Sequence, residues 1–440
     1  MASLKSSVAL KKLSRRIVEK TLPNGLKVRL YPDSTTPAFS YQTFFNVGSR
    51  NERPGITGIS HLFEHMMFNG SKKFQGGRFD KILESQGGHS NAYTSCDMTV
   101  YYNNVASEAL ETVMALEADR MHALRITPKT LETERQVVLE ERLLRVDNDM
   151  TGMMDEELSA LVWRAHPYRW PVIGYAGDIA SISREDCLEF FRTYYAPNNA
   201  ILVIAGDIDV ERTFRMLKKY YGKIPSGPPI PPVVNSEPEQ KGERRAEIRF
   251  PTQAPYVMVA WRGPPVVSQD TLVLDVLQYI LGGGHSSRLV RNLVFEKEVA
   301  VSIAVQWFWR VDPGNFTVVM ELHPGGDVRE AERMLYEELD LVLKNGIRSE
   351  ELKKALNNLS MQMLENFSTY QGCAHSLGAY EMYWGSWQEG LKLPLRYSKI
   401  SEEQVRECAR RYLKQELRSV VHLLPPATPT EQCSAKQGEI

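Results

Sequence analysis

A proline-rich break near the middle of the chain most constrains the fold. In the segment IPSGPPIPPVVNSEPEQKGERR, residues 225–245 contain a cluster of prolines, show no hydrophobic periodicity and end in a strongly charged run. These features are typical of linkers. The flanking halves, residues 1–224 and 246–440, run through the same kinds of element in the same order. Because 440 residues also exceed one ordinary domain, we predict two similar tandem domains joined by this linker.

Each half combines strand-like and helix-like segments. In the first half, NGLKVRLYPD and FSYQTFFNVGS alternate as strands do, and GGHSNAYTSCDMTVYYNNV is typical of a strand pair. In the second half, APYVMVAWRGP and VAVSIAVQWFWRVDPGNFTVVMELHP repeat this pattern around the helical SQDTLVLDVLQYILGGG. Runs of strands followed by runs of helices indicate an α+β fold, with helices covering a largely antiparallel sheet in each domain.

Charge and hydropathy exclude several partners. The chain has 53 basic and 54 acidic residues and a formal net charge of -1, so no global field attracts nucleic acid or anionic lipid. No segment reaches the roughly 18 apolar residues of a membrane span. We therefore expect a soluble protein with neither a nucleic-acid partner nor a membrane span.

Cysteine usage indicates a reducing compartment. The cysteines are odd in number, widely spaced and free of Cys-x-x-Cys pairs, which argues against a disulfide framework. They are Cys96, Cys187, Cys373, Cys408 and Cys433. We predict a cytoplasmic protein. The basic, serine-containing start MASLKSSVALKKLSRRIVEK leaves organellar targeting as an alternative, and a periplasmic location is another.

The segment HLFEHMMFNG, residues 61–70, concentrates chemistry on one short apolar helix. If residues 59–68 are helical, His61 and His65 stack one turn apart and Glu64 projects from the same face. The opposite, apolar surface consists of Ile59, Leu62, Phe63 and Met66. Two imidazoles placed in this way can share one zinc ion, and the carboxylate can reach a water on the metal.

A third metal ligand must come from elsewhere, because catalytic zinc usually has three protein ligands. The best source is TPKTLETERQVVLEERLLRVDN, in which Thr127 can cap a helix and Pro128 suits its first position. Glu134 and Glu141 are seven residues apart and share a face of this helix. Glu140 is an equally good candidate from periodicity alone, and an acidic helix of this kind is often simply solvated.

These residues resemble the pitrilysin and insulinase superfamily, whose motif His-x-x-Glu-His reverses the order found in thermolysin-like zinc peptidases. The resemblance also includes GISHLFEHMMFNGSKKF, GGHSNAYTSCDMTVYY, ETERQVVLEE and LGGGHSSRL, in family order, and it covers nearly the whole chain. It implies a zinc-dependent endopeptidase that hydrolyses short or unfolded peptides, with one Zn²⁺ per chain in the N-terminal domain.

The resemblance also implies roles for individual residues. His61 and His65 match the zinc-binding histidines, and Glu64 matches the general base. The family's third ligand, a glutamate about 76 positions beyond the second histidine, matches Glu141. Glu134 matches a glutamate that supports the metal ligands from behind. In the segment resembling SNAYTS, Asn91 and Ala92 match positions that contact the substrate backbone.

The sequence departs from the family pattern in its second half. Active relatives carry an arginine and a tyrosine seven residues apart after the glycine-rich turn, and here those positions are Val294 and Val301. This loss is similar to the two-chain processing peptidases, in which a related subunit supplies the missing pair. The resemblance thus implies a heterodimer with a homologous partner, with a homodimer as the alternative. A non-catalytic structural or chaperone-like, peptide-binding subunit is the alternative function.

Overall fold

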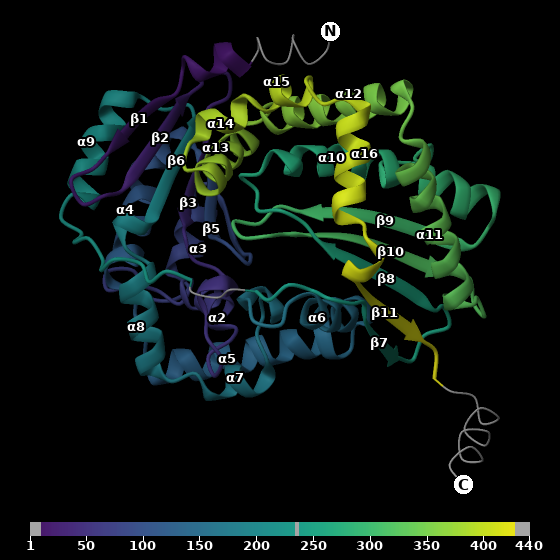
Figure 1. Ribbon diagram of the computed structural model, residues 1–440. Coiled ribbons are helices and arrows are strands. Elements are labelled where there is room, and N and C mark those ends of the chain that lie inside the picture. Colours follow the sequence, from purple (N-terminus) through teal and green to yellow (C-terminus); the bar gives the residue numbers. More distant parts are fainter. Residues whose placement is uncertain (1–9, 234–236, 427–440) are drawn as a thin grey trace. The chain divides into compact units, whose positions relative to one another are not determined.

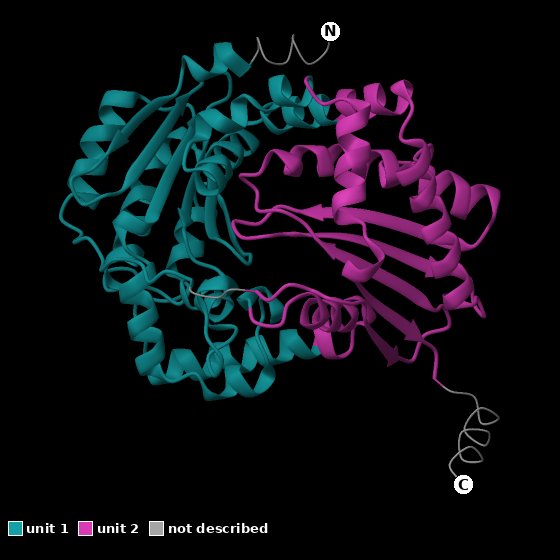
Figure 2. Ribbon diagram, in the orientation of Figure 1, with its two compact units in different colours: residues 1–143, 166–236, 359–398 teal, residues 144–165, 237–358, 399–440 magenta. Residues whose placement is uncertain are grey.

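The computed structural model describes residues 10–233 and 237–426. The chain forms two compact units, shown in different colours in Figure 2. Unit 1 contains residues 1–143, 166–236 and 359–398, and unit 2 contains residues 144–165, 237–358 and 399–440. Among the described residues, no helix combines the length and the apolar character needed to cross a bilayer.

Unit 1 is built on a six-stranded sheet with the order β1-β2-β6-β3-β5-β4 (Figure 1). All neighbouring pairs are antiparallel except β2 with β6. The strands are β1 (Val18–Thr21), β2 (Lys27–Pro32), β3 (Ala38–Phe45), β4 (His89–Thr94), β5 (Thr99–Ala106) and β6 (Ala200–Gly206). Strand β6 is buried along its whole length. Strand β4 forms one edge of the sheet.

The helices of unit 1 lie on both faces of this sheet. They are α2 (Ile59–Met66), α3 (Arg78–Glu84), α4 (Leu110–Ala123), α5 (Pro128–Arg142), α7 (Ala176–Ser181), α8 (Arg184–Tyr194), α9 (Val210–Tyr221), α13 (Tyr370–Trp384), α14 (Trp387–Leu391) and α15 (Leu393–Tyr397). Helix α13 packs directly on β3 and β6. Gly378 permits this approach, because a Cβ atom there would lie 2.1 Å from the ring of Phe44.

Unit 2 repeats the sheet with one strand fewer, in the order β7-β11-β8-β10-β9. Its strands are β7 (Arg244–Arg249), β8 (Tyr256–Arg262), β9 (Ala300–Phe308), β10 (Asn315–Leu322) and β11 (Arg418–Leu424). Its helices are α6 (Met150–Val162), α10 (Gln269–Gly282), α11 (Val328–Asn345) and α16 (Glu402–Tyr412). The chain passes from unit 2 to unit 1 within α12 (Ser349–Asn366).

The two sheets confirm the predicted duplication and the α+β class. Strands β2-β6-β3-β5-β4 and β7-β11-β8-β10-β9 have the same order, and the only parallel pairs are the first pair of each set, β2-β6 and β7-β11. All other neighbouring pairs in these two sets are antiparallel. Element order along the sequence therefore identified a true topological repeat.

The units differ in two segments from the linear domains 1–224 and 246–440. Residues 144–165, which include α6, belong to unit 2, because α6 packs on β7, β8 and β11. Residues 359–398 belong to unit 1, because α13 packs on its sheet. The described part of residues 225–243 forms no helix or strand.

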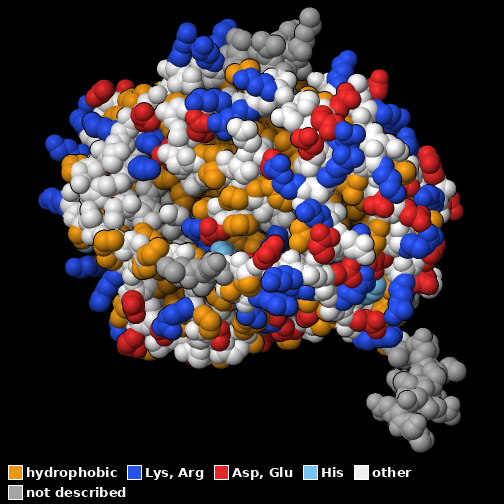
Figure 3. Space-filling model, in the orientation of Figure 1, with side chains coloured by type: hydrophobic (Ala, Val, Ile, Leu, Met, Phe, Trp, Pro, Cys, Tyr) orange, Lys and Arg blue, Asp and Glu red, His pale blue; other side chains and the backbone are white. Residues whose placement is uncertain are grey.

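Surface charge and cysteines agree with the expectations from composition. On the face that Figure 3 shows, basic and acidic side chains are interspersed. Four of the predicted unpaired cysteines are buried and free of disulfides: Cys96, Cys187, Cys373 and Cys408. Cys433 lies outside the described residues.

Candidate metal centre

Helix α2 presents its polar residues on one face, as the sequence predicted. Its buried residues include the four apolar ones expected from the helical periodicity: Ile59, Leu62, Phe63 and Met66. His61, Glu64 and His65 are only partly buried and form the other face. The helix ends at Met66, and Gly70 follows with a φ of 100°, a conformation that favours glycine.

Helix α5 begins at the position predicted from Thr127 and Pro128. The side chain of Thr127 accepts a hydrogen bond from the backbone N–H of Thr130, and Pro128 occupies the first turn. Glu134 and Glu141 lie on the side of α5 that faces α2, because the carboxylates of both residues lie close to the imidazole of His65. Glu140 is exposed and is not among the converging side chains.

Two imidazoles and one carboxylate converge between α2 and α5. The Oε2 atom of Glu141 lies 3.6 Å from Nε2 of His61 and 3.3 Å from Nε2 of His65. The two imidazole rings are arranged edge to face, with centroids 4.8 Å apart. Among the described residues, these three form the single group of histidine, cysteine or acidic side chains placed to hold a metal ion.

The spacing fits a zinc ion better than direct hydrogen bonds. Zn–N and Zn–O bonds of about 2.0–2.1 Å at tetrahedral angles place neighbouring ligand atoms about 3.3–3.4 Å apart. The observed separations of 3.3 and 3.6 Å bracket this value. They exceed the usual range of N–H···O hydrogen bonds, which is about 2.7–3.2 Å. His61, His65 and Glu141 therefore have the donor chemistry and the geometry of a three-ligand zinc site.

Glu134 approaches His65 from the other side of the ring. Its Oε2 atom lies 3.5 Å from Nδ1 of His65, opposite the Nε2 atom that faces Glu141. Burial acts to lower the pKa of His65, but the contact with Glu134 and the charges of Glu141, Glu134 and Glu64 outweigh burial, so the pKa ends above its ordinary value. The supporting role of Glu134 stays a prediction; partners in this position fix the orientation of a ligating imidazole.

Glu64 is held by a residue that the sequence did not single out. The Oγ1 atom of Thr94, the last residue of β4, donates a hydrogen bond of 2.6 Å to Oε2 of Glu64. Burial raises the pKa of Glu64, and the hydrogen bond from Thr94 opposes this rise. The end of the edge strand therefore fixes the position of the Glu64 carboxylate.

Asn91 and Ala92, for which substrate contact remains a prediction, lie on β4. They pair with Tyr102 and Tyr101 of β5, and the opposite side of β4 is an edge of the sheet. The backbone N–H of Ala92 donates to the side-chain oxygen of Asn91 (2.8 Å). A cavity of about 370 Å³ adjoins the start of this strand. It is lined by Phe68, Asp80, Leu83, Glu84, Gly88, His89, Ser90 and Asn91.

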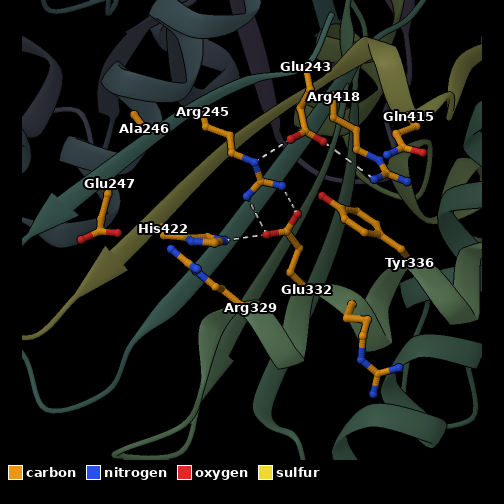
Figure 4. A pocket seen from close by; sticks show the side chains of 11 residues that line it. Glu243, Arg245, Ala246, Glu247, Arg329, Glu332, Tyr336, Gln415, Arg418 and His422 are labelled. Carbon is orange, nitrogen blue, oxygen red and sulfur yellow. Dashed lines mark hydrogen bonds and ion pairs between the residues drawn. The ribbon is translucent and has the colours of Figure 1, made fainter.

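A larger cavity in unit 2 has a different character. It measures about 680 Å³ and contains charged side chains that are largely paired with one another (Figure 4). Arg245 and His422 both bind the buried carboxylate of Glu332, at 2.8 Å in each case. Burial acts to raise the pKa of Glu332, but these hydrogen bonds outweigh it and hold the pKa well below its usual value. This network is a structural tie between α11 and the β7–β11 edge.

The two positions that the family resemblance assigns to an arginine and a tyrosine lie in unit 2. Val294 belongs to a short π-helix, Val290–Glu296, and Val301 lies on β9 with 46% of its surface exposed. Arg288 is nearby in sequence, but it is bound by both carboxylate oxygens of Glu351, at 2.8 and 2.6 Å. It therefore has a structural partner and does not replace the missing arginine.

A duplicated α+β fold with a centre of two histidines and one carboxylate defines the class of zinc-protease-like proteins. Residues 27–175 match the family described as Insulinase (Peptidase family M16), and residues 181–359 match Peptidase M16 inactive domain. The chain belongs to peptidase family M16, the pitrilysin and insulinase family.

Individual relatives support this assignment. The zinc protease PqqE of Helicobacter pylori is 31% identical over 364 residues, which cover 82% of each chain. The crystal structure of a protease from Helicobacter pylori superimposes with a TM-score of 0.89 at 29% identity, covering 93% of this chain and 99% of that one. A protein of Arabidopsis thaliana named "Probable mitochondrial-processing peptidase subunit beta, mitochondrial" is 25% identical over 405 residues, covering 89% of this chain and 75% of the relative.

The choice between Glu141 and Glu140 as metal ligand is testable by metal content. We expect Glu141→Gln to lower zinc affinity by at least tenfold, because one of the three converging donor atoms loses its charge. Glu140→Gln is the matched control, since it removes an exposed carboxylate from the adjacent position and should leave zinc affinity unchanged. Equal zinc affinity in both variants, measured by chelator competition, would contradict the assignment.

The role of Glu134 is testable by the pH dependence of zinc binding. His65 must be deprotonated to bind metal, so zinc affinity should decline as pH falls below its pKa. Because Glu134 raises that pKa, Glu134→Gln should move the onset of this decline to lower pH, while weakening affinity at high pH. Zinc titrations between about pH 5 and 8, around the ordinary histidine pKa, measure both effects. An unchanged onset would show that Glu134 does not act on His65.

Proposed function

We propose that this chain is a zinc-dependent endopeptidase that hydrolyses short or unfolded peptides. The observation that carries the proposal is the convergence of His61, His65 and Glu141 on one point beside Glu64. The family adds support, since relatives bear the name zinc protease. Zinc at such a centre lowers the pKa of a bound water and polarises the scissile carbonyl.

The residues of the chain divide the remaining work. Glu64, with one oxygen fixed by Thr94, accepts the proton of the attacking water and delivers it to the departing amine nitrogen. Its raised pKa suits this double role, because a base with a pKa closer to neutrality both accepts and returns a proton readily. Peptide-bond hydrolysis results.

Strand β4 supplies the means of holding a peptide. It is the edge of the sheet in unit 1, and its last residue contacts Glu64. An extended peptide added to this edge would form main-chain hydrogen bonds that depend little on its sequence. A substrate carbonyl would replace the side-chain oxygen of Asn91 as the acceptor of the Ala92 N–H. We therefore propose broad specificity limited to substrates that can become extended.

An alternative function is favoured by the second half of the chain. Residues 181–359 match a domain described as inactive, and valines occupy the positions of the missing arginine and tyrosine. A structural or peptide-binding subunit of this kind would bind peptides without cleaving them. Turnover therefore decides between the two functions.

The central experiment replaces the general base. Glu64→Gln should retain zinc, because the metal ligands are untouched, and should lower peptide cleavage by roughly 10²- to 10⁴-fold. Glu140→Gln again serves as control and should cleave at the wild-type rate. Cleavage of a mixed peptide library and bound zinc are measured on the same preparations. A wild-type chain that binds zinc and peptide but shows no turnover with any partner would support the alternative function.

We also propose a homologous partner subunit that supplies the missing arginine and tyrosine. Mixing the chain with such a subunit from the same source should raise cleavage well above the sum of the separate rates, because substrate would then be held by both chains. Size-exclusion chromatography distinguishes this heterodimer from a homodimer. Full activity of the isolated, monomeric chain would contradict the proposal.

A further inference from the structure

The N-terminus of α2 is capped in an unusual way. Its first cap position is Gly58, with a φ of 87°, and it has no side chain to accept a hydrogen bond. A Cβ atom at this position would lie 2.3 Å from the carbonyl oxygen of Ile173. The serine, threonine or aspartate that normally caps a helix is therefore excluded here. The free N–H groups of the metal-binding helix need an acceptor from elsewhere in the chain.

Glu52 supplies that acceptor from outside the helix. Its Oε2 atom accepts the backbone N–H of Gly58, and its Oε1 atom accepts that of Ser60, each at 2.9 Å. Only 6% of Glu52 is exposed, and burial raises its pKa to about 8, although the two hydrogen bonds oppose this rise. No ion pair of Glu52 is found among the described residues. The two backbone N–H groups at the start of α2 are therefore satisfied by the two oxygens of one buried side chain.

A second clamp holds the loop that packs against this N-terminus. Gly174, with a φ of 86°, lies so close to Gly58 that a Cβ atom on it would be 2.5 Å from the Cα of Gly58. The carbonyl oxygen of Gly174 accepts a 2.7 Å hydrogen bond from Nη1 of Arg142. Arg142 is buried, with 7% exposure, and directly follows Glu141 on α5. The contacts therefore run without a gap from Glu52, through two glycine backbones, to the end of α5.

We propose that Glu52 and Arg142 are positioning residues that together set the separation of α2 from α5, and with it the geometry of the metal ligands. The inference rests on the proposed metal site. Neither residue belongs to the group of side chains that could hold the metal. Glu52 fixes where α2 begins, and Arg142 fixes where α5 ends relative to the same glycine contact. Because the ligand atoms come from both helices, a shift of either helix opens the centre.

The test is a double-variant cycle with zinc affinity as the readout. Glu52→Gln keeps the shape of the side chain but turns an NH₂ group toward one of the two backbone N–H groups. Arg142→Met removes the donor to Gly174, and Arg142→Lys keeps a charge and one donor. We expect Glu52→Gln and Arg142→Met each to weaken zinc binding roughly 10- to 100-fold, and Arg142→Lys to recover part of the loss.

The double variant distinguishes a shared role from two separate ones. If both residues act on the same separation of α2 from α5, the double variant Glu52→Gln with Arg142→Met should bind zinc only slightly more weakly than the single variant with the lower zinc affinity. Losses that multiply would overturn the joint role. The visible absorption of the Co²⁺-substituted protein, which reports coordination geometry, should change in the same variants.

Glu381→Gln controls for the general cost of altering a buried carboxylate. Glu381 is 3% exposed, lies in the same unit and also accepts a backbone N–H, that of Trp387. It should lower the melting temperature without altering zinc affinity. Zinc affinity that is unchanged in Glu52→Gln, with a lowered melting temperature of the metal-free protein, would overturn the proposal. A wild-type chain that binds no zinc would instead contradict the proposed function itself.

Discussion

The approach of α5 to α2 is the contact on which the candidate site depends. It places Glu141 against two imidazoles and brings Glu64 and Glu134 close to the same point. Three partly buried carboxylates so close together repel one another and lose hydration. Burial raises the pKa of Glu64, with a smaller contribution from Glu141, and the neighbouring carboxylates raise the pKa of His65 against its burial. A divalent cation would balance this negative charge, so both the ligands and the neighbouring carboxylates favour metal binding at this point.

Local sequence patterns were sufficient to predict individual helices and strands. The apolar face of α2 and the cap of α5 follow from spacings of three and four residues and from Thr127 and Pro128, which are properties of a few adjacent residues. The repeated order of strands and helices likewise anticipated two sheets of matching topology. Choosing Glu141 over Glu140 required either family spacing or coordinates, because both residues lie on the same stretch of helix.

The sequence could not identify residues that act across long separations. Thr94 meets Glu64 only because β4 runs beneath α2, and no local pattern separates Thr94 from Tyr93 or Ser95. Strand alternation does place Thr94 on the same face as Ala92, so known strand pairing would have indicated it. Glu52 appears in the sequence as an ordinary charged loop residue. Its burial follows from a glycine that cannot carry its own cap, which only the packing reveals.

The exchange of helices explains why the halves of this duplicated chain are not independent. Sheet topology is the same in both units, yet each sheet is covered by a helix encoded in the other half of the chain, α13 for unit 1 and α6 for unit 2. Without α13, Phe44 and the buried faces of β3 and β6 would be exposed to water. A cut at the linker would therefore leave two incomplete cores. The two repeats share one topology, but each needs a helix from the other half of the chain to complete its core. The repeat in unit 1 carries the candidate metal ligands.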